Sequence, residues 1–154
     1  MEFAGIWKKH GQVYAAPGYY ALRMYSTARA TKPVAVETES GSYSVQRGLS
    51  RLPEIADVPY LDVVAALNDA GDTLTLFCVN RSLNTDIPAN ITLSGFSASG
   101  QARVQTLQAG SLNEGNDEDE PDRVIPVQTQ EATNHGGLRH VFPHESVTVI
   151  TLHK

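Results

Sequence analysis

The stretch "YLDVVAALNDAGDTLTLFCVNRS", residues 60–82, consists of two apolar runs separated by a short polar break. Apolar runs of this length, bounded by Asn, Asp and Gly, are typical of β-strands joined by a tight turn. We therefore expect strands over 60–67 and 73–79, with the turn at 68–72.

The second of these strands has large side chains on both faces. Residues of a strand point alternately to opposite sides, so Leu74, Leu76 and Cys78 share one face while Phe77 and Val79 share the other. A strand of this kind is predicted to be central in its sheet and covered on both sides.

The rest of the chain carries similar short segments. Alternating apolar and polar residues occur at 34–38, 87–93, 104–107 and 145–152, with turn residues between them. Six to eight short strands with no helical pattern between them indicate an all-β fold, an antiparallel two-sheet β-sandwich or jelly roll. We place this sandwich at residues 31–154.

Residues 1–30 follow a different pattern, which predicts short helical segments. A first helical face is formed by Phe3, Ile6, Trp7 and His10 and ends at Gly11. A second helix begins at Pro17, a residue that suits the first turn, with an apolar stripe at Tyr20, Leu22 and Met24. Helices this short need a larger body to pack on.

Length and charge exclude several functions. The chain has 154 residues, enough for one domain, and a formal net charge of −5. Nucleic-acid or anionic-membrane binding would need a basic surface, so we expect neither. The start, "MEFAGIWKKHGQ", lacks the features of a signal peptide, which slightly favours the cytoplasm without fixing the compartment.

Cys78 is the one cysteine, so no internal disulfide can form. Its apolar surroundings predict a buried core thiol, and no nearby base marks it as a nucleophile.

Two groups of polar residues are candidates for metal sites. Residues 113–123, "NEGNDEDEPDR", hold six carboxylates, which predicts a solvated acidic loop; a calcium site is the alternative left open. The five histidines do not follow a zinc-binding spacing; they are His10, His135, His140, His144 and His153. Pro143 and the strand pattern argue against a helix that would bring His140 and His144 together.

Catalytic signatures are absent from the sequence. A glycosidase needs two carboxylates across a cleft, and Glu37 and Glu39 are interpreted instead as surface residues on an edge strand. There is no nucleophile elbow, phosphate loop or dinucleotide motif. We assign no catalytic, cofactor-binding or metal-binding residue to this chain and expect no cofactor.

Several segments, taken in order, resemble a known family. They are "YYALRMYS" at 19–26, "VPYLDVVAALN" at 58–68, "LTLFCVNRS" at 74–82, "DEPDRVIPV" at 119–127 and "FPHESVTVITL" at 142–152. Together they resemble the C-terminal domain of the α-L-arabinofuranosidases of glycoside hydrolase family 51, from about Gly5 to Leu152. The most specific points are Leu61-Asp62, Asn80-Arg81 and the stretch from Pro143 to Ser146.

This resemblance implies a domain organisation. In the family a TIM barrel carries the catalytic glutamates and precedes the sandwich, so residues 1–30 would be the end of a barrel plus a linker, and 31–154 the C-terminal domain. No position here matches the catalytic glutamates, so we expect the chain alone to be inactive. Arabinose-containing polysaccharides would be reached only through the parent hydrolase.

The resemblance also implies partners. The first is the catalytic barrel, which the sandwich would stabilise, and a homo-oligomer is a second option. In the family a strand from the N-terminus of the full enzyme joins the sandwich. That strand lies outside this sequence, so we expect an unpaired sheet edge.

Two other functions stay open at this point. A stand-alone carbohydrate-binding module would need a row of exposed aromatic residues. Candidates cluster in the first 25 residues: Trp7, Tyr14, Tyr19, Tyr20 and Tyr25. Those of the sandwich lie mostly in apolar strand patterns: Tyr43, Tyr60, Phe77, Phe96 and Phe142. A small cupin-like enzyme would need two or three histidines with a carboxylate around a metal, which the histidine spacing does not provide.

Overall fold

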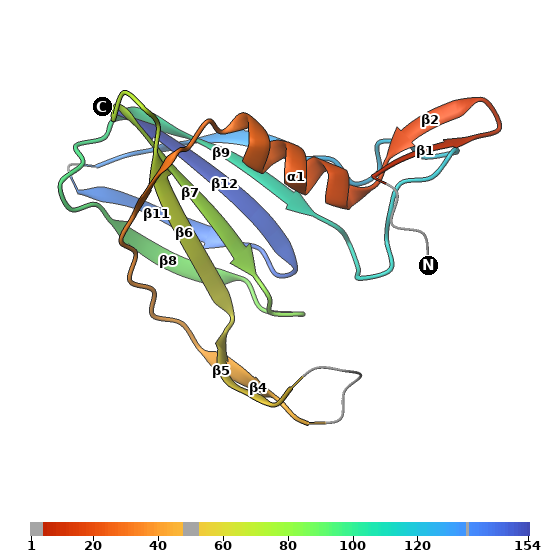
Figure 1. Ribbon diagram of the computed structural model, residues 1–154, viewed down its shortest axis with the longest axis horizontal. Helices are drawn as coiled ribbons and strands as arrows, with labels where there is room; N and C mark the ends of the chain where they lie inside the picture. Colours follow the sequence, from red (N-terminus) through yellow and green to blue (C-terminus); the bar gives the residue numbers. More distant parts are fainter. Residues whose placement is uncertain (1–4, 48–52, 135) are drawn as a thin grey trace.

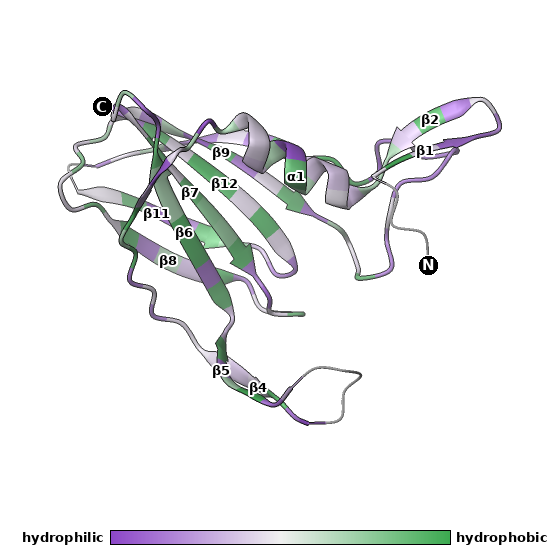
Figure 2. Ribbon diagram, viewed as in Figure 1, coloured by the Kyte–Doolittle hydropathy of each residue, from purple (hydrophilic) through white to green (hydrophobic). Residues whose placement is uncertain are grey.

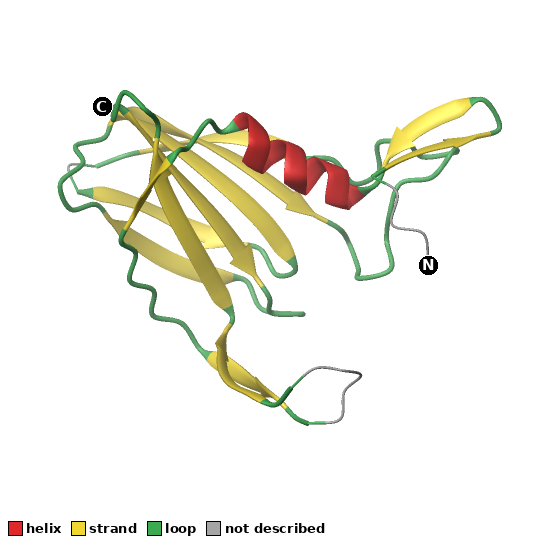
Figure 3. Cartoon of the chain, in the orientation of Figure 1, coloured by secondary structure: helices red, strands yellow, loops and turns green. Residues whose placement is uncertain are grey.

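The computed structural model describes residues 5–47, 53–134 and 136–154. Within them one helix and twelve strands form, in the order β1 (Ile6–Lys9), β2 (Gln12–Ala15), α1 (Pro17–Thr27), β3 (Lys32–Val34), β4 (Ser42–Val45), β5 (Ile55–Pro59), β6 (Leu61–Leu67), β7 (Thr73–Asn80), β8 (Ile87–Thr92), β9 (Ser99–Gln108), β10 (Val127–Ala132), β11 (Gly137–Phe142) and β12 (Ser146–His153). Strands dominate the chain, as Figure 3 shows.

Six of the strands form one antiparallel sheet in the order β10-β9-β12-β7-β6-β3. A second layer, the antiparallel pair β11-β8, lies against one face of this sheet, and α1 crosses the other face (Figure 1). The all-β antiparallel sandwich predicted from the sequence is therefore confirmed.

Strand β7 lies between β12 and β6, as its two apolar faces predicted. Leu74, Leu76 and Cys78 belong to the main core, together with Phe142 of β11 and Ile150 of β12. This cluster fills the space between the sheet and the second layer. Both β6 and β7 are strongly hydrophobic in Figure 2.

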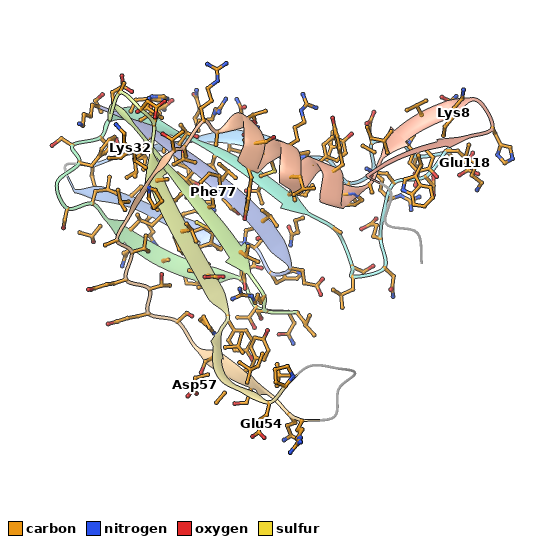
Figure 4. The ribbon with its side chains drawn as sticks, in the orientation of Figure 1. Lys8, Lys32, Glu54, Asp57, Phe77 and Glu118 are labelled. Atoms are coloured by element: carbon orange, nitrogen blue, oxygen red, sulfur yellow. The ribbon has the colours of Figure 1, made fainter. Side chains whose placement is uncertain are left out.

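The opposite face of β7 is covered by the helix. Met24 is 3% exposed and forms a second buried cluster with Leu107, Val124 and Val149. The ring of Tyr25 meets Phe77 edge-to-face, with centroids 4.7 Å apart. Figure 4 shows Phe77 in the middle of the sheet, beside α1. A helix this short is not stable alone, and it is stabilised here by burying apolar side chains against the sheet.

The turn between β6 and β7 has the predicted position. The side-chain oxygen of Asn68 accepts hydrogen bonds from the backbone N–H groups of Gly71, Asp72 and Thr73, at 2.8, 3.1 and 3.2 Å. Gly71 has a φ of +76°, which favours glycine. These contacts set the register of the hairpin through the turn itself.

The first predicted helix is wrong. Residues Ile6–Lys9 form β1, which pairs with β2 in a hairpin; Phe3 lies outside the described residues. His10 and Gly11 have φ values of 47° and 87°, and two consecutive left-handed residues match the twist of a two-residue hairpin turn. The apolar residues have a helical spacing, but the turn at His10 and Gly11 makes this segment a hairpin instead.

The second predicted helix, from Pro17, is confirmed as α1. Its buried residue is Met24, and Tyr20 is half-buried, but Leu22 is 72% exposed and does not belong to the stripe. Ala21 packs against the cluster instead.

The strand predicted at 34–38 is also wrong in extent. β3 pairs with β6 only from Lys32 to Val34, and beyond this point the chain leaves the sheet. Glu37 and Glu39 are exposed and lie in no strand.

Strands β4, β5, β10 and β11 were not predicted, and β9 is longer than the expected 104–107. Strands β4 and β5 form an arm that projects from the sandwich, with Glu54 and Asp57 upon it (Figure 4).

The expected unpaired edge is present. In the part of the chain that the structure describes, β8 and β11 pair with each other alone, so each has an outer edge without a strand partner. Strands β3 and β10 end the larger sheet in the same way.

Two neighbouring residues of β11 allow the core to be tested. Phe142 is 1% exposed and Val141 is 48% exposed. Replacing Phe142 by Ala should lower the free energy of unfolding by about 3–5 kcal/mol, because a large cavity is left between the layers. Val141→Ala should change it by less than about 0.5 kcal/mol. Urea denaturation followed by circular dichroism measures both; equal effects would contradict the sandwich core.

Candidate functional site

The three segments most specific to the family resemblance meet at one end of the sandwich. Asn80 of β7 pairs with Leu61 of β6 on one side and with Ser146 of β12 on the other. The Ser146 hydroxyl donates to the carbonyl of Pro143 at 2.6 Å. The sequence did not show that these segments lie together, and the structure brings them to one place.

Asn80 connects these strands to the following loop. Its side chain is 1% exposed and donates to the carbonyls of Thr85 and Phe142, at 3.0 Å each. Its oxygen accepts from the N–H of Ser82 at 2.9 Å. All of these partners are backbone groups, and the hydrogen bonds to Phe142 and Ser82 are buried, so the role of Asn80 is architectural.

An ion pair lies beside Asn80. The guanidinium of Arg81 is 2.5 Å from the carboxylate of Asp62 and also donates to the carbonyl of Pro59 at 3.1 Å. Both charges are used in joining β6 to the end of β7.

The acidic segment 113–123 folds back onto the β1–β2 hairpin. Asn116 donates to the carbonyl of Ala15 at 2.7 Å and to that of Val124 at 3.0 Å. Glu118 is 2.5 Å from Lys9, whose ammonium holds the pKa of this carboxyl below its usual value. Figure 4 shows Glu118 beside the β1–β2 hairpin. Asp117 accepts from the N–H groups of Asp119 and Glu120.

These carboxylates are therefore partly engaged within the loop and with the hairpin. Among the described residues no group of three or more His, Cys, Asp or Glu has a metal-binding arrangement.

The histidines are dispersed. His140 of β11 is 7% exposed and lies 2.7 Å from Glu131 of β10, whereas His144 lies in the following turn, 2.7 Å from Asp86. His153 contacts Thr73 at the other end of β7, and His135 lies outside the described residues. The sequence argument against a helix through His140 and His144 is confirmed.

The Glu131–His140 pair was not found by sequence reasoning. It joins an edge strand of the main sheet to the second layer, and two of its atoms, Glu131 Oε2 and His140 Nε2, are buried without a protein partner. No local pattern indicates such a pair, because its two members come from different strands of different layers.

Cys78 is buried in the main core, 1% exposed, as predicted. Burial raises the pKa of its thiol to about 12, and the nearby Asp62 carboxylate adds to the effect. A thiol that stays protonated at neutral pH is a poor nucleophile.

Two adjoining surface depressions lie along α1, with volumes of about 540 and about 310 Å³. The larger is lined by Tyr20, Arg23, Met24, Thr27, Gln105, Asp122, Ile125 and Pro126. The smaller is lined by Ile6, Val13, Tyr14, Ala15, Tyr19, Tyr20, Pro121 and Asp122. We name the two together the α1 groove. Asp122 is the one carboxylate of this lining, so the groove lacks the pair that glycoside hydrolysis needs.

The aromatic residues of the first 25 positions are thus divided. Tyr14, Tyr19 and Tyr20 line the α1 groove, Tyr25 packs on Phe77, and Trp7 lies opposite Tyr14 in the hairpin.

Comparison with known proteins agrees with this architecture. The family model described as "Alpha-L-arabinofuranosidase C-terminal domain" matches residues 4–146. The chain belongs to this family. A search of curated proteins gave no match.

Solved structures of α-L-arabinofuranosidases share the fold. That of Thermotoga maritima, an arabinose complex, is 21% identical with a TM-score of 0.88, covering 98% of this chain and 32% of that one. The family 51 enzyme of Bifidobacterium longum is 24% identical with a TM-score of 0.79, covering 98% and 28%. The enzyme of Thermotoga petrophila is 22% identical with a TM-score of 0.85, covering 96% and 31%. This arabinofuranosidase C-terminal domain therefore spans about a third of the length of these structures.

None of the helices in the described residues is long and apolar enough to cross a membrane.

The state of Cys78 can be tested by thiol modification. At pH 8 a thiol with a pKa of about 12 is ionised to about one part in ten thousand, and it is also shielded from solvent. Reaction of the native domain with a disulfide reagent should be at least about 100-fold slower than reaction of the urea-unfolded domain. Similar rates in the two states would contradict the burial of β7.

Asn80 provides a second test. Asn80→Ala removes three hydrogen bonds to backbone groups, so the free energy of unfolding should fall by roughly 3 kcal/mol. Asn90→Ala, at an exposed position of β8, is the matched control and should change it by less than about 0.5 kcal/mol. Chemical denaturation measures both variants. A mild effect at Asn80 would show that the junction of β6, β7 and β12 does not depend on this side chain.

Proposed function

We propose that this chain is the non-catalytic part of an α-L-arabinofuranosidase acting on arabinose-containing polysaccharides, and that it stabilises the catalytic barrel. Residues 1–30 would form the end of the barrel and the linker, and residues 31–154 the appended sandwich. The catalytic carboxylates would belong to the barrel. The solved relatives are named as arabinofuranosidases and are about three times as long as this chain, which supports the proposal.

The observation that carries the proposal is the partly covered face of the main sheet. The helix contacts β9 and β12, while on the β6 side Val64 is 57% exposed and Tyr25 is 39% exposed. Leu22, on the outer side of α1 and three residues before Tyr25, is 72% exposed. Apolar residues gathered on one side of a domain indicate a contact surface.

We name Leu22, Tyr25 and Val64 the barrel-facing patch. It adjoins α1, the segment that would connect to a preceding barrel. An apolar surface at this position would be covered when the two domains pack together, and its burial would stabilise both.

The open edges of β8 and β11 support the same proposal. Backbone N–H and C=O groups on such edges favour pairing with another strand. The family resemblance supplies an occupant, a strand from the N-terminus of the full enzyme. A second copy of the chain is the alternative occupant, which would give a homo-oligomer.

Association in trans tests the proposal. The catalytic barrel of the same enzyme, produced as a separate polypeptide, should bind this chain and gain thermal stability and activity on 4-nitrophenyl α-L-arabinofuranoside. The chain alone should not hydrolyse it. Val64→Asp should weaken the association at least about tenfold, because a charge would be placed in an apolar contact.

Leu83→Asp is the matched control. Leu83 is exposed to a similar degree, 63%, but lies in the loop after β7, outside the barrel-facing patch and outside the open edges of β8 and β11. It should leave association unchanged. No association of the wild-type chain, or equal losses for the two variants, would contradict the proposed role of the patch.

A further inference from the structure

The two parts of the α1 groove adjoin each other, since Tyr20 and Asp122 line both. The volume of its larger part, about 540 Å³, is within the range of small-ligand sites, roughly 300–1,000 Å³. The groove runs from the β1–β2 hairpin along α1 to β9, between the helix and the loop before β10.

The walls of the groove are held in place by the protein itself. Asn116 ties the loop to Ala15, at the end of β2, and it both donates to and accepts from Val124. Val124 is 2% exposed and packs with Met24, which lines the groove from the helix side. The groove is therefore preformed, which lowers the entropic cost of binding a ligand.

Three polar side chains of the larger part are not used within the protein, whereas the Thr27 hydroxyl donates to the carbonyl of Arg23 at 2.7 Å. In the described part of the chain, the side chains of Arg23, Gln105 and Asp122 make no hydrogen bond or ion pair to another residue that would occupy them. Arg23 and Asp122 carry opposite charges and line the same depression without forming an ion pair. A ligand could therefore accept hydrogen bonds from the Arg23 guanidinium, donate to the Asp122 carboxylate, and do either with the Gln105 amide.

These groups select for ligands that both donate and accept hydrogen bonds. A hydroxyl group can donate to Asp122 and accept from Arg23. An anionic ligand would be opposed by Asp122 and by the acidic residues of the same loop, and a cationic one by Arg23. The rings of Tyr14, Tyr19 and Tyr20 offer apolar surface with a polar tip, which suits a molecule with C–H faces and hydroxyl edges.

We propose that the α1 groove binds a short neutral oligosaccharide, and so serves as an auxiliary sugar-binding site of the hydrolase away from its catalytic carboxylates. The choice of arabinose-containing oligosaccharides rests on the proposed function. The groove itself is defined by this chain alone.

Helix geometry separates the groove from the barrel-facing patch. Residues three, four and seven apart share one side of a helix. The helix residues that line the groove have this spacing: Tyr20, Arg23, Met24 and Thr27. Leu22 and Tyr25 of the barrel-facing patch lie on a different side of α1. The two surfaces are thus separate, and the same domain can use both.

Titration of the ¹⁵N-labelled chain with arabino-oligosaccharides, followed by NMR, tests the proposal. Amide shifts should concentrate on α1, β9 and residues 116–126 and saturate in the millimolar range or below. Asp122→Asn and Arg23→Gln should each weaken binding about five- to tenfold, because each removes a charge-assisted hydrogen bond. Tyr20→Phe, which keeps the ring, should have a smaller effect.

Asp119→Asn is the matched control, since Asp119 is an aspartate of the same loop that does not line the groove. It should bind as the wild type does. No saturable shifts up to about 10 mM sugar, or equal affinities of the Asp122 and Asp119 variants, would overturn the proposal. Binding here is measured without the barrel, so failure of sugar binding is distinct from failure of barrel association.

Discussion

Strand β7 must bury large side chains on both of its faces, and the rest of the domain is arranged around this constraint. A sheet with solvent on one side would leave either Leu76 or Phe77 in water. The β8–β11 layer covers the first face and α1 covers the second. The short helix and the sheet therefore stabilise each other, because each buries apolar surface that the other would leave exposed. The burial of Cys78, with its raised pKa, follows from the same arrangement.

The residues that hold the strands together are distinct from the surfaces that are free to bind a partner or a ligand. Three residues on which the family resemblance was based, Asn80, Arg81 and Asp62, form hydrogen bonds and an ion pair that join strands and the following loop. Two unoccupied surfaces lie on different sides of α1: the barrel-facing patch of Leu22, Tyr25 and Val64, and the polar α1 groove. A domain built in this way contributes contacts to a larger enzyme while its own core carries no reactive group.

The sequence predicted what depends on local periodicity and turn chemistry. The β6–β7 hairpin followed from two apolar runs around Asn68 and Gly71, and its central position from the apolar residues on both faces. The β1–β2 hairpin was missed because residues 6–10 have a helical spacing, and the left-handed turn at His10 and Gly11 decided the outcome. The Glu131–His140 pair and the α1 groove depend on contacts between distant segments, which periodicity does not encode.

The central claim, that β7 is covered on both sides by one cooperative structure, is tested most directly by native-state hydrogen exchange. Amides of β7 and β12 should exchange only through global unfolding, and those in the middle of α1 should be protected well beyond an isolated 11-residue helix. Exchange of α1 at the rate of a free peptide, while β7 stayed fully protected, would contradict the claim, because the helix would then not be part of the core.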